Sequence, residues 1–135
     1  MIAYGLASEH TLGNLVEWNG NNGHVYFYQS EYPYDVTQEN YGNMGYVSYK
    51  VNDNVSSHYA YGIGAYSYFR DHYVDVTASI VAPTSDQVKF TNSLSVFLNG
   101  QGKIDYVIDQ TGNSVSGNGQ TAYVCQYDAE SAVIA

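Results

Sequence analysis

The sequence predicts an all-β protein, and three features of the chain support this class. No segment of useful length keeps the apolar spacing that an α-helix requires. Sixteen tyrosines favour strands, and thirteen glycines favour the tight turns between them. Short apolar or alternating runs recur along the chain, and we expect strands at residues 2–7, 15–18, 25–29, 46–51, 59–69, 73–80, 88–98, 103–108 and 122–125.

Turn signals bound these strands. The run Asn-Gly-Asn-Asn-Gly at residues 19–23 is the strongest of them, and residues 52–54 end the strand that starts at Tyr46. A polar turn at residues 70–72 separates two long strand patterns. Residues 99–102 and 112–119 contain the glycines expected in the last turns.

The spacing of the strands predicts how they are arranged. Strand starts recur at intervals of roughly 20 residues through the first eighty positions, which suits the coils of a parallel β-helix; they are marked by Leu6, Val25, Val47 and Ile63. Later signals lie closer together and favour antiparallel strands. We therefore predict one all-β unit, with right-handed parallel β-helix coils over residues 1–82 passing into a small antiparallel β cap over residues 83–135.

Composition excludes several classes of partner. The chain has 135 residues, enough for one domain, and a net charge of −9. Nucleic acids and anionic membranes attract clustered Lys and Arg, and this chain has four cations, which are scattered. No apolar run approaches the ~20 residues of a membrane span. The first residues lack the basic segment of a signal peptide, so we expect no signal peptide in this sequence.

We expect no metal or other cofactor. The four histidines, His10, His24, His58 and His72, do not show the spacing of metal ligands such as His-x-x-x-His. The single cysteine, Cys125, excludes an internal disulfide.

Two carboxylates, Glu9 and Glu31, form the strongest candidate site. Glycoside hydrolysis needs one carboxylic acid to protonate the leaving oxygen and a second group to activate water or act as nucleophile. Apolar or aromatic surroundings raise the pKa of such an acid by desolvating its charged form. Glu31 is set among Tyr28, Tyr32 and Tyr34, and aromatic faces are also surfaces on which sugar rings pack. The alternative is a solvated carboxylate at a strand end, with the tyrosines serving as strand formers.

Several segments resemble one family of enzymes. Residues 4–10 (YGLASEH), 18–23 (WNGNNG) and 25–35 (VYFYQSEYPYD) resemble the C-terminal part of glycoside hydrolase family 55. That family comprises β-1,3-glucanases built from two side-by-side parallel β-helices. Residues 61–71 (YGIGAYSYFRD) are similar to the closing region of the same group and its pectate-lyase-like relatives.

The resemblance implies an inverting mechanism and a set of site residues. Glu31 would be the general acid, and Glu9 would be the carboxylate that assists water or the surrounding charge network. The acid and the water-activating group of an inverting enzyme stand roughly 6.5–9.5 Å apart. Residues one coil apart in a β-helix are neighbours at about strand spacing. The residues expected to contact the glucan are Tyr34, Trp18, Tyr32, Tyr28 and Gln29.

The chain is much shorter than members of that family, which supply water-positioning residues from their first β-helix. We therefore expect a second chain that supplies the N-terminal β-helix, or self-association. The resemblance also implies an extracellular location and a polysaccharide substrate. The competing hypothesis is a non-catalytic, β-rich protein that binds carbohydrate or self-assembles.

Overall fold

The computed structural model describes residues 1–129, and strands are its main secondary structure. In chain order the elements are β1 (Ile2–Glu9), β2 (Val16–Trp18), β3 (Gly23–Glu31), the 3₁₀ helix η1 (Gly42–Met44), β4 (Tyr49–Val51), β5 (Ser57–Val81), β6 (Gln87–Ile108) and β7 (Gln120–Tyr127). Within this range, no helix has the length and apolar character needed to cross a membrane.

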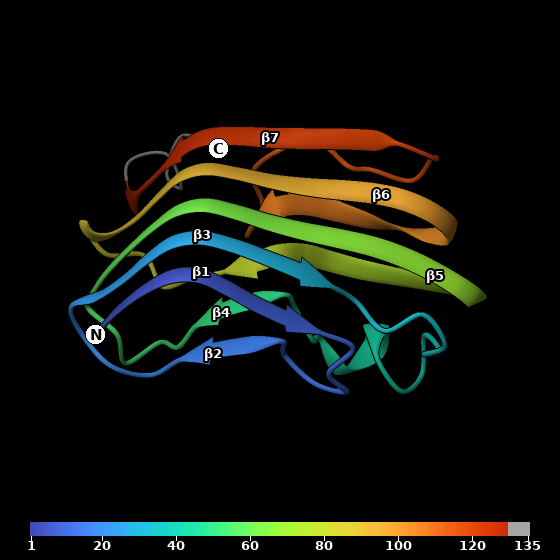
Figure 1. The fold of residues 1–135 in the computed structure, drawn as a ribbon, viewed down its shortest axis with the longest axis horizontal. Coiled ribbons are helices and arrows are strands. Elements are labelled where there is room, and N and C mark those ends of the chain that lie inside the picture. Colours follow the sequence, from blue (N-terminus) through green and yellow to red (C-terminus); the bar gives the residue numbers. More distant parts are fainter. Residues whose placement is uncertain (130–135) are drawn as a thin grey trace.

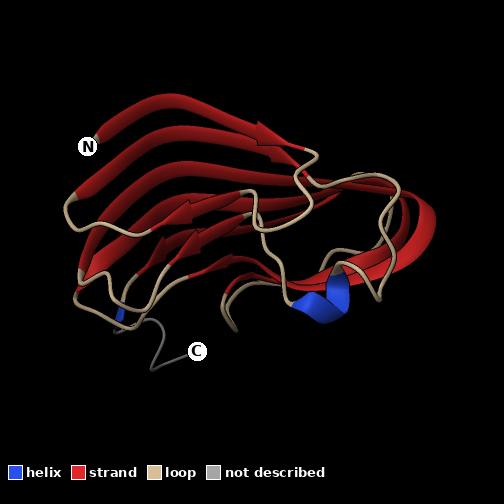
Figure 2. Cartoon of the chain, turned by 90° about the horizontal axis from the view of Figure 1, so that it is seen from below, coloured by secondary structure: helices blue, strands red, loops and turns tan. Residues whose placement is uncertain are grey.

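The strands wind into the coils of a parallel β-helix. β1, β3, β5 and β6 lie side by side and run parallel, which forms a first wall (Figure 1). β2 pairs in parallel with β4, and β4 pairs with the end of β5, so that the chain returns along a second wall. Figure 2 shows the sheet curling from one wall to the other. The predicted all-β class and β-helix architecture are confirmed.

One corner of the coil carries a residue with positive φ on each strand. Gly5, Phe27, Gly62 and Asn92 have φ values of 67°, 69°, 71° and 55°, and the residues flanking them pair in register across β1, β3, β5 and β6. A left-handed residue bends the strand without ending its ladder of hydrogen bonds. Two consecutive side chains at the corner, such as Tyr26 and Phe27, therefore both lie on the outer face. After the corner, side chains again alternate between the outer face and the core, but with the pattern shifted by one residue.

Two predicted turns are bends inside long strands. Residues 70–72 lie within β5 and residues 99–102 within β6, where the pairing of the two strands shifts register between Phe69 and Val74. The chain turns here while its ladder with the neighbouring coil continues. β5 and β6 therefore each contribute to both walls.

The second half of the chain differs from the prediction. Residues 88–98 and 103–108, which we placed in an antiparallel cap, form β6 and run parallel to β5 as a further coil. A further coil covers the side of β5 that β3 leaves open. Among residues 1–129, β7 alone is antiparallel in the main sheet, so the change of direction comes after β6 and not at residue 82. The end of the expected cap, residues 130–135, lies outside the described residues.

The first coil has the expected length, whereas the next two are longer than the expected interval. On the first wall, Ile2 lies beside His24, His24 beside Tyr59, and Tyr59 beside Lys89. The second wall and its loops take up the additional residues. Val47, which we used as a strand marker, lies on that return path, where its carbonyl accepts a hydrogen bond from the Leu15 amide at 3.1 Å.

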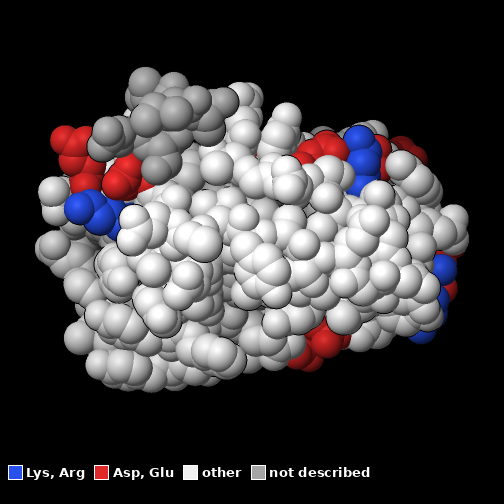
Figure 3. All heavy atoms as spheres, turned by 90° about the horizontal axis from the view of Figure 1, so that it is seen from above, with Lys and Arg blue, Asp and Glu red and all other residues white. Residues whose placement is uncertain are grey.

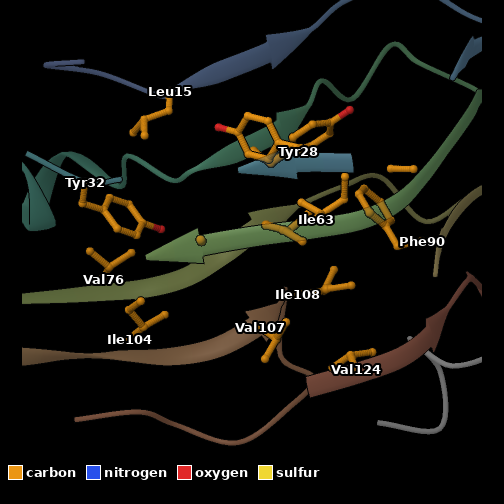
Figure 4. Packing of buried hydrophobic residues seen from close by; sticks show 14 of the residues in the cluster. Leu15, Tyr28, Tyr32, Ile63, Val76, Phe90, Ile104, Val107, Ile108 and Val124 are labelled. Atoms are coloured by element: carbon orange, nitrogen blue, oxygen red, sulfur yellow. The ribbon is translucent and has the colours of Figure 1, made fainter. Parts of the chain in front are cut away.

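The core fills the space between the walls. Figure 4 shows side chains from successive coils converging there, including Tyr28, Ile63 and Phe90. Several of the largest buried side chains are tyrosines, namely Tyr28, Tyr32, Tyr41 and Tyr49. Burying a hydroxyl is costly without a hydrogen-bond partner, and the Tyr28 hydroxyl donates to the Ser48 carbonyl at 3.1 Å.

Candidate active site

The parallel register places the two predicted carboxylates next to each other. Glu9 of β1 pairs with Glu31 of β3, and adjacent strands lie about 4.8 Å apart. Both side chains are on the outer face because their neighbours point inward. The Ser8 hydroxyl donates to the Leu15 carbonyl at 2.8 Å, and Ser30 is fully buried.

Glu31 has two partners on this face. The Tyr34 hydroxyl donates a short hydrogen bond to Oε2 of Glu31, and Nε2 of His10 lies 4.0 Å from the same oxygen. The His10 and Tyr34 rings meet edge to face, with centroids 4.4 Å apart. The bond to Glu31 raises the pKa of Tyr34, because the phenol must give up that proton to ionise. The Glu31 side chain is 25% exposed, so it is accessible to a ligand.

Glu9 is held from the neighbouring coil. The Gln29 amide donates to Oε1 of Glu9 at 3.3 Å. Gln29 lies two residues before Glu31 on β3, so the two side chains share the outer face. The structure therefore brings together four of the predicted site residues: Glu9, Gln29, Glu31 and Tyr34.

Tyr34 is itself positioned by the bend in β5. Its carbonyl accepts a hydrogen bond from the Arg70 amide at 3.0 Å, and its ring lies 5.1 Å from the ring of Tyr68. The Arg70 guanidinium is 6.0 Å from the Tyr34 ring centroid and pairs with Asp71 at 2.7 Å. This exposed ion pair lowers the pKa of Asp71 and orients a cation toward Tyr34.

Three of the residues predicted to contact the sugar do not lie beside the Glu9–Glu31 pair in this structure. Tyr28 and Tyr32 are 1% and 0% exposed and point into the core, because the corner at Phe27 shifts the alternation that follows it. Trp18 packs on His58, with ring centroids 4.9 Å apart, and also lies against Gly23 at the start of β3. Glu31 is at the other end of that nine-residue strand, so Trp18 and the carboxylates lie on opposite sides of the corner at Phe27.

The sequence analysis missed other residues of the site. His10 follows Glu9 directly in the sequence, and this was the one sequence feature that could have identified His10 as a residue of the site. Tyr66, Tyr68 and Arg70 reach the site through β5, and no motif links them to Glu31. Their positions follow from the register of two long coils.

The site lies on an open outer face. A cavity of about 400 Å³ lies elsewhere, beside Asp109 and Tyr127, and one of about 310 Å³ lies beside Trp18. Charged side chains are sparse on the surface seen from the β7 side and lie mainly toward its two ends (Figure 3).

Comparisons with known proteins agree with this architecture. The chain is 37% identical over 123 residues to an exo-beta-1,3-glucanase of Streptomyces sp. (strain SirexAA-E / ActE); the match covers 87% of this chain and 20% of that protein. The structure of sacteLam55A from Streptomyces sp. SirexAA-E matches with a TM-score of 0.89 and 36% identity, over 93% of this chain and 24% of that one. A glutamate-to-alanine variant of sacteLam55A in complex with glucose matches with the same TM-score and 35% identity.

No family model matches the chain. The chain spans about a fifth to a quarter of the length of these relatives. The resemblance found in the sequence is confirmed as homology over most of this chain.

Proposed function

We propose that this chain, a homologue of part of an exo-beta-1,3-glucanase, carries the acid and the assisting carboxylate of a β-1,3-glucan hydrolase. The observation that supports this most directly is the pairing of Glu9 with Glu31 on one accessible face. Most glycoside hydrolases use a pair of carboxyl groups that flank the glycosidic bond.

Each carboxylate has its own role in an inverting reaction. Glu31 in its acid form donates a proton to the glycosidic oxygen as the bond to the anomeric carbon breaks. Glu9, beside Glu31 on the same face, supports the charge network that orders the attacking water, and the further coils proposed below supply the group that takes the water's proton on the opposite side of that carbon. The new hemiacetal then has the inverted, α configuration, and the leaving glucan chain carries the proton from Glu31.

The surrounding contacts prepare the carboxylates for these roles. Tyr34 and His10 fix the position of the Glu31 carboxyl, and the Gln29 amide fixes that of Glu9. A carboxyl held by hydrogen bonds is oriented before the substrate arrives, which lowers the cost of reaching the reactive geometry.

The open face and the free edge of β1 support a second part of the proposal. β1 is an edge of the sheet, and its exposed backbone groups are available to another strand. We propose that further β-helical coils, from a second chain or from a second copy, pair there and enclose the substrate. The proposed substrate is a polymer, so we expect the assembly to act outside the cell.

Light scattering of the native assembly, followed by denaturing mass spectrometry, identifies what accompanies the chain. That assembly is then given laminarin, and the released sugar and its initial anomer are followed by NMR. We expect α-glucose first, and a loss of turnover of about 10²- to 10⁴-fold for Glu31→Gln. The exposed Glu39 provides a matched control, Glu39→Gln, which should keep full turnover. Release of sugar that is the same in both variants would refute the assignment of Glu31. Glucan binding without any release would favour the non-catalytic alternative.

A further inference from the structure

One aromatic side chain beside the carboxylates has no role in the proposal above. Tyr66 of β5 pairs with Glu31 in register, so it is the next residue of the same outward row after Glu9 and Glu31. It is partly exposed, unlike Tyr28 and Tyr32 of the core.

The Tyr66 ring lies along the surface of the sheet. A Cβ atom placed on Gly64 would lie 3.0 Å from Cε2 of Tyr66 and 3.4 Å from its hydroxyl oxygen. The far end of the ring therefore covers Gly64, two residues back on the same strand. Because Gly64 has no side chain, the Tyr66 ring can pack flat over the backbone of Gly64, with its other face toward solvent.

The Tyr66 side chain is partly exposed and is not engaged by the aromatic residues around it. Among residues 1–129, no aromatic ring stacks on Tyr66 and its hydroxyl has no hydrogen-bond partner, whereas the nearby rings of Tyr34 and Tyr68 pack on each other. The neighbour of Gly64 on β3 is Gln29, whose amide holds Glu9. A flat aromatic surface thus adjoins two carboxylates and an amide.

We propose that Tyr66 is a stacking platform for a glucose unit adjoining the bond that is cleaved, with Gly64 as the residue that makes the platform possible. This inference rests on the proposed function. A pyranose packs its C–H face on an aromatic ring, while its hydroxyls reach polar groups at the rim. Gln29 on the adjacent strand β3, and Glu9 on β1 one strand further on, are polar groups of that kind. Tyr66 positions the sugar and takes no part in proton transfer.

The test is the affinity of the chain, in its native assembly, for laminaritriose, measured by isothermal titration calorimetry. Tyr66→Ala should weaken binding about 3- to 10-fold, the range expected for loss of one aromatic contact. Tyr66→Phe keeps the ring and should bind within about twofold of the wild type. Gly64→Ala should weaken binding in the same direction but less than Tyr66→Ala does, because its methyl group would lie 3.0 Å from Cε2 and would push the end of the ring away from the backbone.

Tyr123→Ala is the matched control, since Tyr123 is an exposed tyrosine on β7, 68% accessible and away from the carboxylates. Circular dichroism melting verifies that each variant is folded. Binding that is unchanged in both Tyr66→Ala and Gly64→Ala would overturn the inference, as would the absence of any binding by the wild type.

Kinetics separate this inference from the proposed function. If hydrolysis depends on Glu31, we expect Tyr66→Ala to raise KM with little change in kcat. A residue with a merely structural role would not change KM alone. If KM is unchanged while Glu31→Gln is inactive, the platform is wrong and the carboxylate assignment stands. If no sugar is released but Tyr66→Ala still weakens binding, the platform stands without the catalytic role.

Discussion

The stability of this protein should fall at mildly acidic pH because of His58. Its side chain is 2% exposed and packs against the rings of Trp18 and Phe90. Nε2 lies 2.8 Å from the Tyr49 hydroxyl, while Nδ1 has no hydrogen-bond partner among the described residues. Protonation would therefore place a charge, and an N–H without an acceptor, in the core.

The magnitude follows from the pKa of His58. Burial, with a smaller contribution from the nearby His24, lowers the pKa from 6.5 to about 4. The unfolded chain binds this proton more readily than the folded chain, so stability is complete above about pH 6.5 and falls as the pH drops toward 4. At 1.36 kcal/mol per pKa unit, linkage gives a loss of about 2 kcal/mol between pH 7.5 and pH 5.

Urea unfolding at several pH values between 7.5 and 5 measures this loss. Trp18 is the single tryptophan of the chain and lies 4.9 Å from the His58 ring, so its fluorescence reports unfolding at the relevant place. His58→Gln should flatten the pH dependence by about 2 kcal/mol, even if it is less stable at pH 7.5. His72→Gln, at an exposed position, should leave it unchanged. The reasoning is refuted if the wild type and His58→Gln lose stability equally over this range.

Two further predictions concern the corner and the end of the β-helix. Gly62→Ala should lower the free energy of urea unfolding by about 1–2 kcal/mol, because φ is +71° at this corner; Gly13→Ala, in open space and without positive φ, is the control, and equal effects would contradict the reasoning. Tyr127→Phe removes the hydroxyl that donates to Oδ2 of Asp109 at 2.5 Å and should cost about 1–3 kcal/mol at pH 7. The exposed Tyr123→Phe should cost little, and a Tyr127→Phe variant as stable as the wild type would show that the bond is not needed.

Local sequence patterns predicted the fold class well. β-branched and aromatic residues in alternating runs specify strands whatever their partners, and the glycine- and asparagine-rich segments specify the turns. The parallel direction of β6 was not predicted, because the same alternating pattern suits parallel and antiparallel pairing. Residues 99–102 illustrate the difficulty, since a local turn signal there marks a bend within one long strand.

For the candidate site, the sequence by itself determined the chemistry available: two glutamates, an adjoining histidine, and tyrosines nearby. The tertiary structure decided which of these meet. Phe27 takes a left-handed conformation at the corner, which shifts the alternation after it; Glu31 therefore points outward, while Tyr28 and Tyr32 enter the core. Such a conformation is rare for a bulky residue and has no local signal in the sequence.

The register between coils is the other feature that only the tertiary structure decided. Glu9 and Glu31 are neighbours because the first coil closes after Glu9, and Tyr66 joins them because the much longer second coil returns to the same wall. Coil length depends on loops that pack across the interior, and these contacts join residues far apart in the chain. The local sequence therefore determines which residue types are available, whereas the folded β-helix determines which of them lie side by side.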